Sequence, residues 1–388
     1  MKNSIFLLKT FYFFYFAAAA SLAPFLALFY EQRGLAGHQI GLLTAVPPLV
    51  TLFAASLWGA WADATQQHRR LLTLSMVGVM VFALGIFLAA SFLWLIPLVI
   101  AFAFMGAPIN PLIDNTSLEV LGERRHQYGK LRLWGAVGWG AAGPVAGWLV
   151  ERLGLGWSFY SYVLLMAVGL IVTLRLPISY VSIGQAFWRG LGLLLRQRRW
   201  LLFLVVVFVA GVGSSLIHNY LFLYMQALGA SKTLMGLALT VATLSELVVF
   251  TVSDKLLRRW GTRKVLGLAL VMVVVRLLAY SLTRAPWLVL IIQLLHGLTF
   301  SITWVAGVSY AHKIAPSGMG ATAQGIFGSV FMGLAATVGA LTGGWLYESV
   351  GPFVMYRWGG LGVLAGLIVL GAVGSFGQRS ARQVTVKA

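Results

Sequence analysis

Apolar residues occur along this chain in long runs, which short polar intervals interrupt. Each run has about 20 residues, the length at which an α-helix crosses the hydrocarbon core of a bilayer. We place the runs at residues 6–29, 39–62, 71–90, 93–117, 129–150, 158–176, 201–225, 234–253, 265–283, 287–311, 320–345 and 354–376. The pattern predicts an all-α membrane protein with twelve transmembrane helices.

One polar interval is longer than the others and separates two sets of six runs. We therefore expect an N-terminal six-helix bundle at 1–176, a cytoplasmic central loop at 177–200 and a C-terminal six-helix bundle at 201–388. The loop part from Gly190 to Trp200 is either an amphipathic segment on the membrane surface or a plain linker. The first run is too long for a signal peptide and lacks a clear cleavage site, so we expect it to remain as a helix.

The composition narrows the class of protein. The chain is 60% hydrophobic and 10% charged, and its mean hydropathy is +0.90, which is too apolar for a soluble domain. The absence of Cys excludes disulfides and thiolate metal sites. The sequence shows no nucleotide-binding loop, metal-ligand cluster or nucleophile arrangement. We therefore expect no enzyme activity and no cofactor.

The basic residues predict the orientation in the membrane. The net charge is +19, and most of the 28 lysines and arginines fall in the intervals on one side of the predicted spans. Lys and Arg collect on the cytoplasmic side of membrane proteins. Both termini are thus predicted to be cytoplasmic, in a bacterial-type inner membrane. Because the positive charge follows the membrane topology, we expect no nucleic-acid partner. We also expect the protein to be a monomer in the bilayer.

Two charges lie inside apolar runs on either side of the basic loop at 120–127. Asp114 precedes the loop by about two helical turns and Arg132 follows it by one to two turns, so the two reach similar depth and can pair. A charge in a bilayer costs at least a few kcal/mol, which makes an intramembrane ion pair a functional-site hypothesis. A purely structural ion pair is the alternative.

Other polar residues inside the predicted spans are few. They cannot face lipid at low cost, so we expect them to line a shared aqueous cavity or to pair with each other. Among them are Glu246, Arg276 and His296 in the C-terminal half. Breaking a contact between an arginine and a carboxylate favours proton uptake, and a histidine can also carry a proton. His296 is equally well explained as a helix–helix contact.

A similar element follows the second and the eighth run. The first copy reads GAWADATQQHRRLL and the second TVSDKLLRRWGTRKVL. Each places an acid at the cytoplasmic end of a helix, with bases shortly after it. The acids are Asp63 and Asp254, and the bases are Arg69, Arg70, Arg263 and Lys264. Such an acid can pair with a neighbouring helix end when that side is shut, as a conformational latch; topological charge alone is the alternative.

Twelve runs, a central loop and the G-x-W-A-D…R-R element resemble the major facilitator superfamily. The copies depart from the usual motif, because Ala64 replaces a basic residue, Gln66 replaces a glycine and Phe250 replaces the leading glycine of the second copy. The resemblance implies two six-helix halves with a solute site between them and alternating access.

Residue order suggests a particular group within that superfamily. Glu246, VVVRLLAYS around Arg276 and LLHGLTF around His296 are similar to the lactose-permease type of sugar/proton symporter. YGKLRLWGAVGW at 128–139 is similar to the same group, and still more to its phenylpropionate-permease relatives. The resemblance implies that Asp114 (or Glu119) and Arg132 bind solute and that Glu246, Arg276 and His296 couple protons.

The sequence departs from the sugar symporter at one position that concerns the coupling of proton and solute transport. Thr299 stands where the sugar symporter carries a proton-bearing carboxylate, so the proton would ride on Glu246, His296 or Asp114. The remaining candidates for solute contact are Asn115, Trp139, His218 and Asn219.

We therefore predict a proton-coupled symporter of a small organic solute, either a sugar or oligosaccharide or an aromatic carboxylate such as 3-phenylpropionate. Uniport and antiport remain open. A proton-driven multidrug exporter of the same fold is the alternative, and it would favour cation-binding acids without partner arginines.

Overall fold

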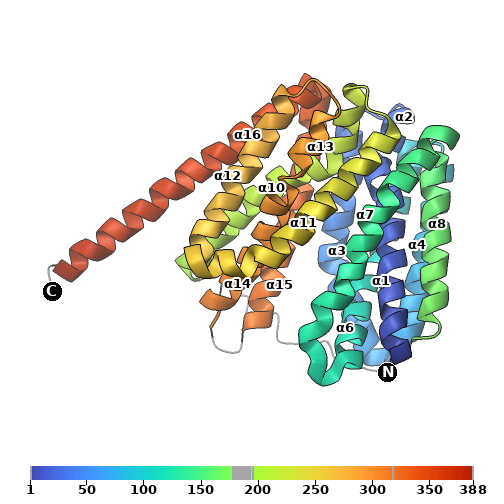
Figure 1. Cartoon of the computed structure of the whole chain (residues 1–388), viewed down its shortest axis with the longest axis horizontal. Coiled ribbons are helices and arrows are strands. Elements are labelled where there is room, and N and C mark those ends of the chain that lie inside the picture. The colour runs from blue at the N-terminus through green and yellow to red at the C-terminus, as the bar shows by residue number, and fades with distance from the viewer. Residues whose placement is uncertain (1, 177–193, 195, 317–318, 387–388) are drawn as a thin grey trace.

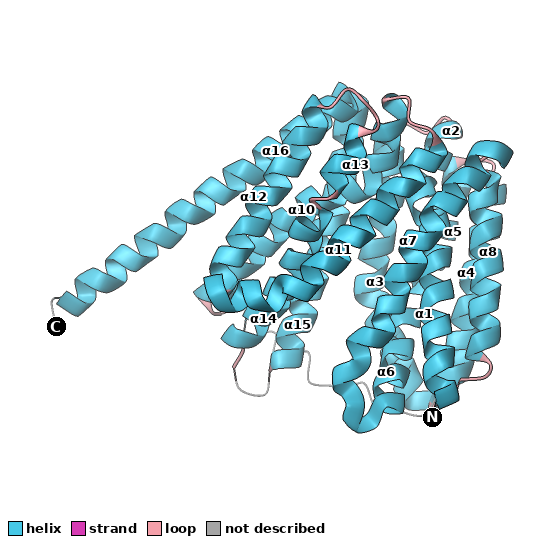
Figure 2. Ribbon diagram, viewed as in Figure 1, coloured by secondary structure: helices cyan, strands magenta, loops and turns pink. Residues whose placement is uncertain are grey.

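The described part of the chain consists of helices joined by short loops (Figures 1 and 2). The computed structural model describes residues 2–176, 194, 196–316 and 319–386, with side chains except at 2, 63, 126, 321 and 371–386. These residues contain no strand, which confirms the all-α prediction. Most of the predicted central loop lies outside the described residues.

The N-terminal half contains ten helical elements. They are α1 (Lys2–Leu22), η1 (Ala23–Phe25), α2 (Leu26–Gln32), α3 (Gly37–Thr65), α4 (His68–Leu88), α5 (Phe92–Gly106), α6 (Ile109–Leu121), η2 (Gly122–Gln127), α7 (Tyr128–Leu153) and α8 (Gly156–Thr173). Helix α1 packs against α7 and α8 and so lies at the centre of this half.

The C-terminal half follows the undescribed loop. Its elements are α10 (Arg198–Ala227), α11 (Lys232–Trp260), α12 (Thr262–Leu282), α13 (Leu288–Gln293), η3 (Gly297–Ser301), α14 (Ile302–Ile314), α15 (Gly320–Gly328), η4 (Ser329–Leu334) and α16 (Ala335–Val386). Both η3 and η4 are π-helical turns. Helix α16 contains Gly351 at φ +77°, where two helices meet at a kink.

By length and composition, 10 of the described helices can cross a membrane. The predicted run at 129–150 corresponds to α7, which is 26 residues long but falls outside that set because its many glycines make it less apolar. The predicted runs at 320–345 and 354–376 form one stretch, Thr322–Leu370, that continues through Gly351. A multi-pass membrane fold is thus shown, and the count of twelve stays a prediction.

The two halves converge at one end of the molecule and diverge toward the end where the N-terminus lies (Figure 1). We call the end where the halves converge the sealed end. Helices α2 and α7 end there, and helices α3 and α11 begin there (Figure 1). We call the other the open end. Two helix pairs, which we call the seams, join the halves: α7 with α11, and α3 with α16.

Both seams are built on glycines. A Cβ atom added at Gly147 of α7 would collide with the carbonyl oxygen of Lys232, and one added at Gly344 of α16 would collide with that of Gly37. Small residues let membrane helices approach at backbone distance. The closest seam contacts therefore occur near the sealed end.

Each seam glycine is followed four residues later by a glutamate, in the repeated phrases AGWLVE (Ala146–Glu151) and GGWLYE (Gly343–Glu348). Glu151 accepts a hydrogen bond from the backbone N–H of Thr233 at 2.9 Å, and Glu348 accepts one from that of His38 at 2.9 Å. Each carboxylate thus caps the first turn of a helix from the opposite half, where N–H groups lack helical partners.

Other polar contacts reinforce the sealed end. The Thr233 hydroxyl also donates to Glu151, and the Thr233 donors hold the pKa of Glu151 below its usual value. Glu31 accepts hydrogen bonds from the Tyr347 hydroxyl and the Gln226 amide of the opposite half. All three acids at this end therefore join the two halves.

Candidate functional site

The first candidate cluster lies in the N-terminal half, where α1, α6 and α7 meet. Nη1 of Arg132 donates to both oxygens of Asp114, at 2.9 and 2.8 Å. The Tyr12 hydroxyl donates to the same carboxylate at 2.6 Å and lies 3.1 Å from the Ser117 hydroxyl. The Arg132 guanidinium lies 5.5 Å from the centre of the Phe16 ring. The sequence-predicted pairing of Asp114 with Arg132 is thus present.

This N-terminal cluster is accessible. The Arg132 side chain is 40% exposed and that of Asp114 is 26% exposed, although both belong to packed helices. Nε and Nη2 of Arg132 donate to no partner among the described residues, so one edge of the guanidinium is available. Tyr12, which the sequence analysis did not single out, is buried and holds the carboxylate in place.

The second candidate cluster lies in the C-terminal half and links three elements in a chain. Nε2 of His296 lies 2.6 Å from Oε1 of Glu246 on α11. Nδ1 of the same imidazole lies 2.8 Å from Nη1 of Arg276 on α12. Since a guanidinium can only donate, Nδ1 must accept, and Nε2 must carry the hydrogen that it donates to Glu246. His296 is therefore a neutral imidazole between an acid and a base.

Arg276 is enclosed by this C-terminal cluster. It is 3% exposed. Besides His296, it donates to the Thr299 hydroxyl at 3.0 Å, to the Gln293 side-chain oxygen and to the Tyr280 hydroxyl at 3.3 Å. Thr299 thus occupies the place of the expected carboxylate as a hydrogen-bond acceptor for arginine. Tyr280 and Gln293 were not among the predicted site residues.

The register of the seam between α7 and α11 sets the relative depth of the two clusters. The Thr240 hydroxyl donates to the carbonyl oxygen of Gly140 at 2.7 Å, and Gly140 also faces Thr243. From that crossing, Glu246 lies about 4.5 Å further along α11 and Arg132 about 12 Å further along α7, both toward the open end. The clusters therefore differ in depth by less than the length of a disaccharide.

The remaining candidates for solute contact lie around these clusters. Asn115 and Trp139 are half-buried and Glu119 is exposed. His218 is exposed. The Asn219 amide donates to the Ser215 hydroxyl at 3.0 Å. No observation assigns a solute to any of them.

The predicted latch lies at the open end. The side chain of Asp63 lies outside the described residues. Asp254 is exposed, as are Arg69 and Lys264. Arg70 donates to Gln67 at 3.1 Å, and Arg263 donates to the Tyr310 hydroxyl at 3.3 Å. The latch stays a prediction for the state in which this end is shut.

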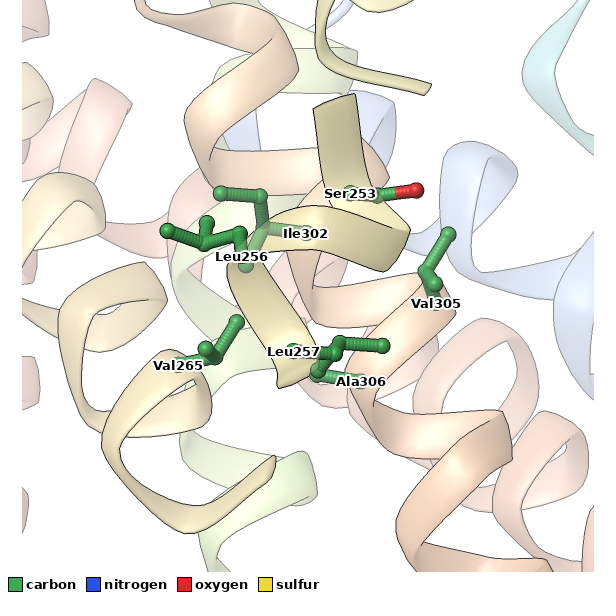
Figure 3. Close-up of a pocket in the computed structure, with 7 residues that line it drawn as sticks. All are labelled: Ser253, Leu256, Leu257, Val265, Ile302, Val305 and Ala306. Carbon is green, nitrogen blue, oxygen red and sulfur yellow. The ribbon is translucent and has the colours of Figure 1, made fainter. Parts of the chain in front are cut away.

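A small recess between α11, α12 and α14 is unrelated to the charged clusters (Figure 3). It is too small to hold a water molecule and is lined by Ser253, Leu256, Leu257, Val265, Ile302, Val305 and Ala306. Its lining is aliphatic apart from Ser253, so it offers no polar recognition of a solute.

Two charged clusters inside a helical membrane fold of two halves are typical of a multi-pass transporter. Residues 5–358 match the MFS_1 like family, and the chain belongs to that family. This confirms the resemblance to the major facilitator superfamily. The protein transports small solutes and is not an enzyme.

Two relatives with named solutes match nearly the whole chain. The maltose permease of Geobacillus stearothermophilus is 31% identical over 363 residues, covering 93% of this chain and 92% of the permease. The probable 3-phenylpropionic acid transporter of Escherichia coli (strain K12) is 26% identical over 363 residues, covering 89% and 92%. Among solved structures, a mutant of the nucleoside transporter NupG matches with a TM-score of 0.85 at 17% identity, covering 95% of this chain and 99% of that one, which shows the fold.

Proposed function

We propose that this protein is a proton-coupled symporter of a neutral oligosaccharide. The two bundles at 1–176 and 201–388 would rock about the seams, with the open end and both termini in the cytoplasm of a bacterial cell. The charged clusters would face one chamber between the halves. A monomer contains every element of this scheme.

The observation that carries the proposal is the Glu246–His296–Arg276 chain. The imidazole Nδ1 is engaged by arginine and Nε2 is already protonated, so an arriving proton binds the Glu246 carboxylate without breaking another contact. Neutral Glu246 no longer compensates the buried charge of Arg276. Because an uncompensated charge in a low-dielectric site is costly, protonation favours rearrangement of the halves.

Solute binding is assigned to the N-terminal cluster. Asp114 and Arg132 neutralise each other while Arg132 keeps donors available. Alternating donors and acceptors without net charge suit sugar hydroxyls, and the similarity to a maltose permease supports this class. The available guanidinium edge also fits a carboxylate, which keeps an aromatic acid such as 3-phenylpropionate as the second candidate.

Uptake into proteoliposomes tests the proposal and separates the candidates. We expect labelled maltose to accumulate when a pH gradient, inside alkaline, is imposed and not when vesicles carry neither a pH gradient nor a potential. A neutral sugar moving with a proton carries net charge, so an inside-negative potential should also drive its uptake. One carboxylate that moves with one proton carries no net charge, so the uptake of 3-phenylpropionate should not depend on the membrane potential. Accumulation of neither solute under a pH gradient contradicts the proposal.

A further inference from the structure

The helix that carries His296 changes its hydrogen-bond pattern on both sides of that residue, because Leu294 and Leu295 donate to carbonyl groups three residues back and a π-helical turn follows His296. Leu288–Gln293 is α-helical, and Gly297–Ser301 forms a π-helical turn before α14 begins. π-Helical segments occur mostly as single turns inside α-helices, frequently at functional sites. The π-turn here begins at the residue next to the imidazole of the proposed proton site.

The backbone N–H of Gly297 donates out of its own helix. Its acceptor is the Ser245 hydroxyl on α11, at 2.6 Å. Ser245 is 8% exposed, so the contact is shielded from solvent. Only glycine fits at position 297, because an added Cβ would collide with the Ser245 carbonyl oxygen.

This contact is adjacent in sequence to the proposed proton site on both helices. Ser245 precedes Glu246, and Gly297 follows His296, so two consecutive residue pairs meet across the helices. A second link lies nearer the sealed end, where the Gln293 amide donates to the carbonyl oxygen of Ala238 at 3.2 Å. Two links on one face of α11 fix both the spacing and the register at which Glu246 meets the imidazole.

We propose that Ser245 and Gly297 are positioning residues of the proton site, which set the contact between Glu246 and His296. The inference rests on the proposed function for its consequence in transport, but its structural part can be tested alone. Without the serine hydroxyl, the Gly297 N–H lacks its acceptor on α11, and the helix around His296 is expected to relax away from its present geometry. That relaxation rotates the imidazole away from the carboxylate.

The test uses the full-length protein in lipid vesicles, labelled with ¹⁵N-histidine and observed by solid-state NMR. His296→Gln assigns the signal of His296 among the 6 histidines. Wild type should show the tautomer with hydrogen on Nε2. Ser245→Ala, which preserves side-chain volume, should give a mixture of tautomers and a shifted pH titration of that signal.

Ser253→Ala is the matched control. Ser253 is a buried serine two turns further along α11, and its hydroxyl bonds only within its own helix, to Phe250. It should leave the His296 signal unchanged. Gly297→Ala, which wedges the helices apart, should reproduce the Ser245→Ala signal. If Ser245→Ala and Ser253→Ala give identical His296 spectra and titrations, the inference is wrong.

Transport adds a second readout. Accumulation of labelled maltose under a pH gradient should fall on the order of tenfold in Ser245→Ala, because displacement of a reacting group by a fraction of an ångström has effects of this size. Solute exchange without a gradient should fall less. Wild-type vesicles that show the expected tautomer but no gradient-driven accumulation would refute the proposed function and leave the positioning role intact.

Discussion

The two charged clusters contain similar groups but differ in accessibility. In the N-terminal half, Arg132 is 40% exposed and uses one nitrogen for its acid. In the C-terminal half, Arg276 is 3% exposed, and all three guanidinium nitrogens donate to neighbouring side chains. An arginine with an available edge can bind a solute, whereas an enclosed one can only hold its neighbours. This difference is our reason for proposing that the N-terminal cluster binds solute and the C-terminal cluster couples protons.

The largest effect is expected for Glu246→Gln. The amide can still accept the hydrogen bond of His296 but cannot take up a proton, so accumulation of solute under a pH gradient should fall to background. Exchange of labelled for unlabelled maltose in the same vesicles should persist. Glu123→Gln, which alters an exposed carboxyl in η2, is the control. Undiminished uptake against a gradient in Glu246→Gln would remove this residue from the mechanism.

A comparison of Arg132→Ala with Arg276→Ala sharpens the contrast between the clusters. Removing Arg276 leaves buried polar partners uncompensated and should cost about 3 kcal/mol or more of stability, seen as a lowered Tm. Removing Arg132 should instead weaken solute affinity by roughly 10- to 100-fold, the effect of losing a charged hydrogen bond, with a smaller change in Tm. Equal losses of Tm in the two variants, or normal solute affinity in Arg132→Ala, would contradict the division of roles.

The smallest effect is expected at the predicted latch. Asp63→Asn and Asp254→Asn should shift the balance between open and shut conformations by about fivefold or less, because an exposed ion pair is worth little. Intrinsic solute affinity should not change. Distances between spin labels at the open end, measured by pulsed electron resonance, report the populations. Identical distance distributions in wild type and both variants would exclude a latch.

Much of the fold was predictable because runs of apolar residues are a strong signal. The pairing of Asp114 with Arg132 followed from equal depth on consecutive helices. Tyr12 could not be predicted as its partner, because nothing in the sequence fixes how α1 rotates toward α6. The π-turn after His296 also left no recognisable pattern, since Gly297 reads like any other small residue in a membrane helix.

The sequence analysis did not predict the contacts that join the two halves, and this is its main omission. The phrases AGWLVE and GGWLYE are a repeat in the sequence, which our sequence prediction did not use. Their glutamates, Glu151 and Glu348, lie just beyond the ends of the predicted runs at 129–150 and 320–345. Only the structure shows that each caps a helix of the opposite half, because the partner lies more than 80 residues away along the chain.

The two seams are built alike, and this similarity affects whether ions can leak between the two halves. If one seam opened while the other stayed closed, the glutamate cap on the closed side would persist and only half of the polar contacts would be lost. A state with one seam open and the other closed would let ions pass between the halves beside a bound solute. Because both flanks use the same glycine spacing and the same carboxylate cap, we expect them to open together. In the proposed transport cycle, simultaneous opening would keep the sealed end closed to ions until the two halves separate there.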